Sequence, residues 1–382
     1  MPRVLLALAV LLLIATQSSA RPANGEAAPE WELTPLAEPV LRLFTPSSGA
    51  FFAQTAQALM RSDDAGDSWQ PVSLGPAETI LEVDPTNHQV LYAAGPNGIY
   101  RTRDDASTWS LILPFSPDVG SIALALAVSP VDPNLVYLAT GGGVHHPAES
   151  HFVRSRDGGA TWQVLENREL ALCTASVTIL RPHPTSAQRV FRTAGCTAGR
   201  TFGTTLSQST DAADTWTPVF NPEPLAAPLL GYPARLVGGQ DGHFYLAVNR
   251  DRRLGGSSLF RTDDDGLTWT QVLAYRGGGT PAYTPAGEDP SAPNIWMGGL
   301  AYDPANPDHV DVGRQSYPDY FAAADGGGVS ESWDGGQTWS DLGRQDIGAV
   351  NDLAWGIDGR NLYAATDQGV WRLRQAPLDE GD

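Results

Sequence analysis

An eight-residue pattern that recurs along the chain constrains the fold more than any other feature. Residues 155–162 read SRDGGATW, and five further segments share the form Ser/Thr-x-Asp-x-Gly-x-Ser/Thr-Trp. They are SDDAGDSW (62–69), TRDDASTW (102–109), STDAADTW (209–216), TDDDGLTW (262–269) and SWDGGQTW (332–339), with Ala106 and Ala213 in place of Gly in two copies. Recurrence at intervals of tens of residues is typical of repeat architectures, in which each repeat forms one unit of an array.

Each copy predicts a tight turn between two antiparallel strands. The Asp carboxylate and the Ser/Thr hydroxyl can accept backbone N–H groups within such a turn, and Gly supplies a positive φ at low cost. Trp then begins the next strand as a large apolar anchor. A catalytic group is needed once, not six times around a molecule, so we interpret all six aspartates as structural: Asp64, Asp104, Asp157, Asp211, Asp264 and Asp334. The DDDG run at 263–266 also suggests calcium, but it lacks the downstream bidentate Glu of an EF-hand loop.

These motifs resemble the Asp-box (BNR) repeat of sialidase-type β-propellers, a group that also includes sortilin-type domains, xyloglucanases and photosystem II assembly factors. The resemblance covers nearly the whole chain beyond residue 20, and is nearest to single-propeller proteins of the assembly-factor and sortilin-like types. It implies a β-propeller but no single activity, because this scaffold hosts hydrolases, receptors and assembly factors.

The spacing of the motifs predicts the number of blades. The six aspartates lie 40, 53, 54, 53 and 70 residues apart, which suits four-stranded blades with loops of varied length. Residues 31–36 resemble the strand after each motif but follow none, and residues 350–374 resemble the strands before a motif but precede none. An N-terminal strand that completes the last blade explains both and leaves no exposed sheet edge. We therefore predict an all-β, seven-bladed propeller of four-stranded antiparallel blades over residues 31–375, with a tail at 376–382.

The N-terminal residues predict export. Residues 1–20 have a charged start, an apolar run and a small-residue cleavage site, as a secretory signal does, and residues 21–30 suit a linker. No other apolar run approaches membrane length, so we expect a secreted or periplasmic protein with no membrane span, and a monomer.

Charge and composition exclude several function classes. The net charge of −19 makes nucleic acid an improbable partner, and all 24 cationic residues are Arg, which excludes lysine nucleophiles and Schiff bases. We expect no cofactor and no bound metal.

The two cysteines predict a disulfide. Cys173 and Cys196 flank an expected hairpin, and they lie opposite each other if Leu180 faces Arg189. In an exported protein such a pair is expected to oxidise and to pin blade four.

The long loops predict where a ligand binds. The turns of the eight-residue pattern belong to one face of a propeller, and the connections between second and third strands and between blades belong to the other. On this second face the chain places extended loops near 141–152, 195–207, 249–258, 275–294 and 313–328, and long loops on a rigid scaffold usually carry binding sites. The candidate ligand-binding residues are His145, His146, Arg200, Arg250, Arg252, Arg253, Tyr283, Arg314, Tyr317, Asp319 and Tyr320.

Other interpretations of these loops remain open. His145, His146 and His151 could hold a transition metal with Glu149, the arginines at 250–253 could clamp a carboxylate, and the loops could also be solvated without a partner.

Two functions follow from these features. The first is a secreted, non-catalytic binding or assembly module that engages a protein or glycan through the loop-rich face of blades three to six. The alternative is a glycoside hydrolase, sialidase-like or another exo-glycosidase, with a diverged site. The Arg-Ile-Pro segment of sialidases does not occur, and a xyloglucanase-like site lies between two propellers where this chain has room for one. We favour the binding module.

Overall fold

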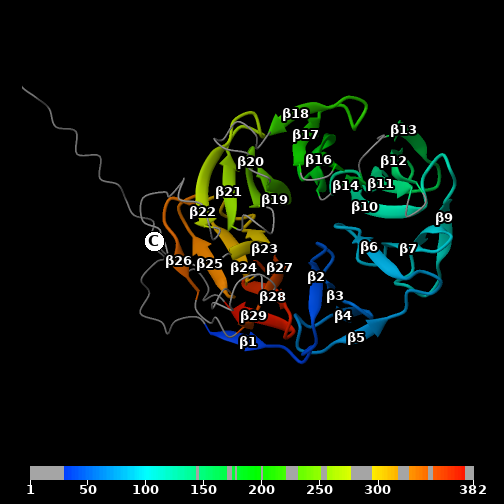
Figure 1. Ribbon diagram of the computed structural model, residues 1–382. Helices are drawn as coiled ribbons and strands as arrows, with labels where there is room; N and C mark the ends of the chain where they lie inside the picture. The colour runs from blue at the N-terminus through cyan, green and yellow to red at the C-terminus, as the bar shows by residue number, and fades with distance from the viewer. Residues whose placement is uncertain are drawn as a thin grey trace, which may run out of the picture.

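The computed structural model describes residues 30–142, 146–169, 174–176, 179–198, 201–220, 231–250, 256–276, 295–316, 327–342 and 347–374. Within these ranges the chain forms seven antiparallel sheets around a central axis, and no α-helix occurs in them (Figure 1). The prediction of an all-β, seven-bladed propeller is confirmed. No helix in the described part of the chain is long and apolar enough to cross a bilayer.

The blades are numbered in chain order. Blade one holds β2 (Val40–Phe44), β3 (Phe51–Thr55), β4 (Leu59–Ser62) and β5 (Gln70–Val72), and blade two holds β6 (Thr79–Val83), β7 (Leu91–Gly95), β8 (Gly98–Thr102) and β9 (Ser110–Pro114). Blade three holds β10 (Ile122–Val128), β11 (Val136–Gly142), β12 (His146–Ser155) and β13 (Gln163–Glu169). Blade four holds β14 (Thr174–Ser176), β15 (Leu180–His183), β16 (Ser186–Ala198), β17 (Thr201–Ser209) and β18 (Thr217–Phe220).

The remaining blades follow the same order. Blade five holds β19 (Gly231–Gln240), β20 (His243–Arg250), β21 (Gly256–Thr262) and β22 (Thr270–Arg276), and blade six holds β23 (Ile295–Tyr302), β24 (Val310–Ser316), β25 (Val329–Ser332) and β26 (Ser340–Asp341). Blade seven holds β27 (Val350–Trp355), β28 (Asn361–Thr366), β29 (Val370–Arg374) and, from the other end of the chain, β1 (Trp31–Leu33).

The repeated pattern forms the turn between the third and fourth strands of blades one to six, here called the Asp turns. In the first, the Ser62 hydroxyl donates to Asp64 at 2.8 Å and accepts the Gly66 amide at 2.8 Å. Asp64 in turn accepts the amide of Ser68 at 2.8 Å and its hydroxyl at 2.6 Å. These hydrogen bonds, the Ser68 hydroxyl foremost, lower the pKa of Asp64 to about 2. The same set of bonds recurs in the other five turns.

One detail of the prediction is wrong. The strand after each turn begins one residue beyond the Trp, as at Gln70, so the Trp ends the turn and does not start the strand. The Trp ring instead packs against a neighbouring aromatic side chain, as in blade one, where the ring centroids of Trp69 and Phe51 are 5.2 Å apart.

A second repeated device joins neighbouring blades. In six blades the second and third strands place an aromatic residue directly opposite an Arg or Gln, and we call these the clamp pairs: Phe52–Arg61, Tyr92–Arg101, Tyr137–Arg154, Phe191–Gln208, Tyr245–Arg261 and Tyr363–Arg372. The Tyr92 hydroxyl donates to the Gly158 carbonyl at 3.2 Å, and Arg101 donates to the same oxygen. Gly158 lies in the Asp turn of the next blade, so a clamp pair holds the neighbouring turn.

The ring is closed by the first strand. β1 pairs with β29, with Trp31 opposite Leu373, and the two strands lie side by side at the lower edge of Figure 1. Trp31 is buried among blade-seven residues and Val329 of blade six. Tyr363 and Arg372 of this blade donate to the Ala65 carbonyl of the first Asp turn at 2.8 and 2.9 Å. The predicted closure is confirmed, and the clamp pair of blade seven holds the first Asp turn there.

The cysteine register is not the predicted one. Cys196 lies opposite Ala175, not Cys173, and Leu180 lies opposite Arg192, not Arg189. The inner strand of blade four is split into β14 and β15, and β16 begins as early as Ser186 after an irregularity at the Pro182 end of β15, so the turn is shorter than the sequence suggested. Cys173 lies outside the described residues, and the disulfide stays a prediction.

Candidate functional site

A cavity of about 670 Å³ occupies the central channel. Its walls are the inner strands of blades one to five, namely β2, β6, β10, β15 and β19. Apolar side chains such as Leu126 and Leu236 line much of it, and four ionisable side chains interrupt them: Arg42, Glu82, Arg181 and Arg235. Volumes of several hundred Å³ with a few polar groups are typical of ligand pockets.

The cavity extends toward the face that carries the Asp turns. Each fourth strand starts at an Asp turn, and the next inner strand runs back toward that face because the strands of a blade alternate in direction. Pro85, Pro130 and Pro184, which follow the inner strands β6, β10 and β15, line the cavity. The cavity therefore lies toward the face opposite the long loops.

Arginines dominate the charge of the channel. Arg42 lies 4.0 Å from Glu82, and Arg235 lies 3.0 Å from Asp352 while it also donates to the Asn351 carbonyl at 2.8 Å. Arg181 donates only a long bond, of 3.5 Å, to the Gly238 carbonyl, and no carboxylate of a described residue lies within 4.0 Å of it.

Burial shifts the pKa values of two of these groups. It raises the pKa of Glu82 to about 7, because the attraction of Arg42 and Arg181 does not offset the loss of water, and it lowers the pKa of Arg181. The channel therefore carries excess positive charge and suits an anionic or strongly polar group of a ligand.

The described lining of the cavity holds one carboxyl group, that of Glu82. Glycoside hydrolysis ordinarily uses two carboxyl groups about 5 to 9.5 Å apart on either side of the bond. Three arginines of the same lining could hold an anionic or polar group of a ligand.

The residues predicted on the loop face are mostly beyond what the structure describes. Arg314 lies on β24, and its guanidinium is held by Asp341 of the same blade at 2.9 and 3.0 Å, so it is committed within blade six. His146 is the first residue of β12 and Arg250 the last of β20, and their side chains are outside the described part. The following also lie outside it: His145, Arg200, Arg252, Arg253, Tyr283, Tyr317, Asp319 and Tyr320. The grouping of these residues stays a prediction.

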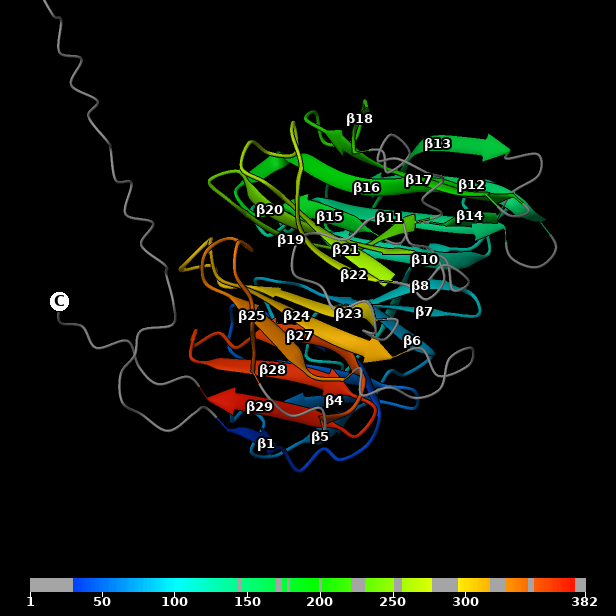
Figure 2. The same ribbon diagram turned by 60° about the vertical axis from the view of Figure 1, so that its left-hand side comes forward.

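The strands that lead to the loop face differ in length between blades. In blade two, β7 and β8 have 5 residues each, whereas in blade four β16 has 13 and β17 has 9. In blade three β12 has 10, and in Figure 2 β12 and β16 are among the longest strands of the upper half of the ring. Extra residues of these blades therefore lengthen hairpins toward that face.

Sequence reasoning missed two groups of residues. The channel residues sit singly within apolar inner strands, as Glu82 does in ILEVDP (80–85), and a charge inside such a run could have indicated a polar channel. The second group is His309, Asp311 and Glu331 of blade six, which replace residues that the other repeats share. Aligning the repeats beyond the Asp turns could have shown that replacement.

Comparisons with known proteins agree with the fold. No family model matches the chain. A xyloglucanase from Paenibacillus sp. is 27% identical over 313 residues, which are 67% of this chain and 29% of that protein. Among solved structures, the GH74 xyloglucanase from Xanthomonas campestris matches with a TM-score of 0.62 at 20% identity, covering 91% of this chain and 54% of that one.

A second solved structure is similar along its whole length. YCF48 bound to a D1 peptide matches with a TM-score of 0.59 at 16% identity, covering 92% of this chain and 98% of that one. The chain thus spans less than a third of the curated xyloglucanase and about half of the solved GH74 enzyme. The structural likenesses show a propeller fold.

Proposed function

We propose that this protein is an extracytoplasmic binding module that engages a protein or a glycan through the loop-rich face of blades three to six. The observation that carries the proposal is the lengthening of the hairpins in these blades, such as β16–β17, on one face of a closed ring. A ring whose blades clamp one another is rigid, and lengthened loops on a rigid scaffold are where propellers place their contacts.

Several features support this function over hydrolysis. The described lining of the channel offers one carboxyl group, not two. A protein solved with a bound peptide is similar to this chain over 98% of its own length. The signal-like residues 1–20 support an extracytoplasmic location, and the hydrogen-bonding pattern of the Asp turns supports assignment of the repeat to the Asp-box type.

A glycoside hydrolase is the second candidate. The sequence similarity to a xyloglucanase over 67% of this chain favours it, and a glycan is accordingly the first ligand to test.

The face can be tested with two matched triple variants. Arg250, Arg252 and Arg253 changed to Ala remove three charges from the loop face. Arg103, Arg156 and Arg360 changed to Ala remove three exposed charges from the Asp-turn face and its inner-strand turns. Binding to immobilised xyloglucan oligosaccharides, and capture of proteins from the envelope fraction of the source cells, are measured for both.

We expect the first triple variant to lose at least tenfold in apparent affinity and the second to bind like the parent. Equal losses in both, or a loss confined to the Asp-turn variant, would place the contact elsewhere. Parent protein that binds neither glycan nor protein would contradict the function itself.

A further inference from the structure

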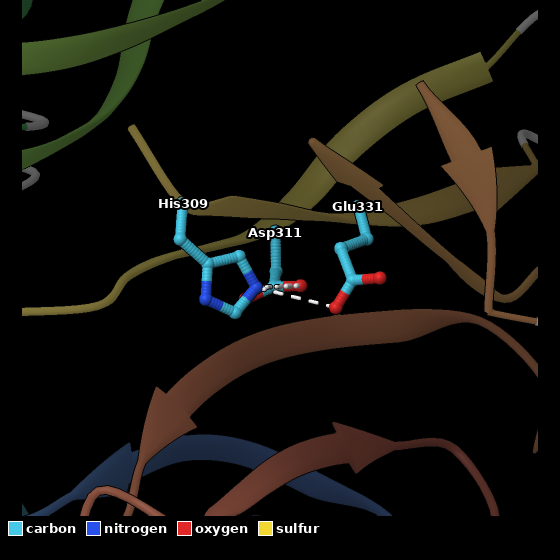
Figure 3. A group of neighbouring side chains, drawn as sticks. All are labelled: His309, Asp311 and Glu331. Carbon is cyan, nitrogen blue, oxygen red and sulfur yellow. Dashed lines mark hydrogen bonds and ion pairs between the residues drawn. The ribbon is translucent and has the colours of Figure 1, made fainter. Parts of the chain in front are cut away.

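Three ionisable side chains converge inside blade six. His309 immediately precedes β24, Asp311 lies on β24, and Glu331 lies directly opposite Asp311 on β25. The Nε2 atom of His309 is 3.2 Å from Glu331 Oε1 and 3.7 Å from Asp311 Oδ1, and the three side chains point toward one another in Figure 3. One ligand atom from each lies within 4.8 Å of the others, and all three side chains are at most 1% exposed.

This group lies at the position of the clamp pairs, and blade six is the blade that has no clamp pair there. The other six blades place Phe or Tyr opposite Arg or Gln, whereas blade six places Asp311 opposite Glu331. Two carboxylates facing each other across a strand pair repel, and burying them without a counter-charge costs several kcal/mol. Five of the other blades have an Arg at this position, whereas in blade six both facing residues are acidic and need a cation from outside the pair.

The position of the blade explains why the clamp could be replaced. Most clamp pairs hold the Asp turn of the next blade, as Tyr92 and Arg101 hold Gly158. In blade five Tyr245 and Arg261 instead bond Pro307 and Asp308, which precede β24. The blade after blade six is blade seven, whose third and fourth strands, β29 and β1, come from opposite ends of the chain. No turn joins these two strands, so a clamp pair in blade six would have no Asp turn to hold.

A further carboxylate orients the imidazole. Asp303 Oδ2 lies 3.3 Å from His309 Nδ1, where it can accept a hydrogen bond from a proton-bearing Nδ1, while Nε2 faces the two other carboxylates. Trp333 stacks on the ring at 3.7 Å, and Trp355 meets it edge-on at 5.1 Å. A histidine that binds a metal through one ring nitrogen usually has a carboxylate or a carbonyl on its other ring nitrogen, which fixes the orientation of the ring.

Asp311 has only weak partners for a buried carboxylate. Both of its oxygens are buried and accept no hydrogen bond of normal geometry from the described residues, and its polar neighbours are His309 Nε2 at 3.7 Å and the indole N–H of Trp355. A buried carboxylate without normal hydrogen bonds, beside a second carboxylate, attracts a cation to the space that Nε2 faces.

We propose that His309 Nε2, Asp311 and Glu331 bind one divalent transition-metal ion, which cross-links β24 and β25 beside the junction with blade seven. One imidazole with two carboxylates is a donor set that suits Zn²⁺ or Mn²⁺. Because the site is closed to solvent and its ligands meet only in the folded sheet, the ion enters during folding and contributes to stability. This proposal replaces the expectation from sequence that no metal is bound.

Metal analysis of matched histidine variants tests the site. His243 precedes Tyr245 in blade five by the same two residues as His309 precedes Asp311, so His243→Ala is the control for His309→Ala. Protein expressed with Zn²⁺ and dialysed against metal-free buffer is analysed by mass spectrometry for metal content. We expect about one ion per chain in the parent and in His243→Ala, and less than a fifth of that in His309→Ala and in the isosteric Glu331→Gln.

A refolding experiment removes the dependence on any one variant. Parent protein unfolded in denaturant with a chelator and refolded without metal should gain about 5 °C or more in Tm when it is refolded with excess Zn²⁺ or Mn²⁺. Should the ligand variants not fold, Asp303→Asn, which touches only the Nδ1 side, should weaken retention of Zn²⁺ by about 10- to 100-fold.

Two results would overturn the proposal. One is parent protein with less than a tenth of an ion per chain and no change in Tm with either metal, which would mean that a proton alone holds the group together. The other is metal retained equally by the parent and by Glu331→Gln, which would place the ion elsewhere.

Discussion

Replacing Trp31 tests how the ring is closed. Trp31 is 4% exposed, lies opposite Leu373, and belongs to a buried cluster that includes Trp371 and, from blade six, Val329. A tryptophan buries roughly 150 to 250 Å², which at about 25 cal/mol per Å² corresponds to about 4 to 6 kcal/mol, and measured Trp-to-Ala changes in cores cost about 3 to 5 kcal/mol. We expect Trp31→Ala to lower the free energy of unfolding by about 3 kcal/mol or more.

Leu33 provides the control on the same strand. Its side chain is 40% exposed and lies opposite Trp371, so Leu33→Ala leaves the pairing of β1 with β29 in place and should cost about 1 kcal/mol or less. Urea unfolding followed by far-UV circular dichroism measures both variants. If Trp31→Ala costs no more than Leu33→Ala, β1 does not close the ring in solution.

Two further predictions concern the Asp turns and the channel. Gly336→Ala should cost roughly 1 to 3 kcal/mol more free energy of unfolding than Gly66→Ala in thermal or urea unfolding. Both glycines have φ near +90°, but the added methyl group would lie 2.7 Å from Val272 at Gly336 and 3.4 Å from Thr34 at Gly66. Equal losses would refute this packing argument. Glu82 has a folded-state pKa of about 7 against an ordinary value of 4.5, so the fold binds its proton more tightly than the unfolded chain and loses stability as pH rises through this range. Relative to Glu82→Gln, the parent should lose up to about 3 kcal/mol between pH 4.5 and pH 8 in urea titrations, and parallel curves for the two proteins would show that Glu82 is not buried as described.

The parts of the fold that could be predicted from sequence are those with a local cause. The Asp turns are specified within eight residues, because Asp64 and Ser62 hydrogen-bond amides at most four residues away. Closure could be predicted because residues 31–36 resemble a strand that follows a turn motif and residues 350–374 resemble strands that precede one, yet neither segment adjoins a motif.

The parts that could not be predicted depend on how distant segments meet. Arg42, Arg181 and Arg235 share one cavity only because their strands are arranged around one axis. The cysteine register failed because the turn beyond Pro182 is shorter than the run of loop-forming residues there suggests. The blade-six group carries no local motif, and it becomes visible only when Asp311 and Glu331 are compared with the clamp pairs of other blades.

Whether the protein binds glycans without turning them over can be measured in one experiment. The parent protein and Glu82→Gln are incubated with xyloglucan oligosaccharides and with a panel of fluorogenic glycosides that includes a sialoside, while retention on the same immobilised glycans is recorded. The account predicts that any glycan retained by the parent is recovered intact, with no product above the protein-free blank. Product that increases with protein concentration and disappears in Glu82→Gln would contradict the account and identify a hydrolase.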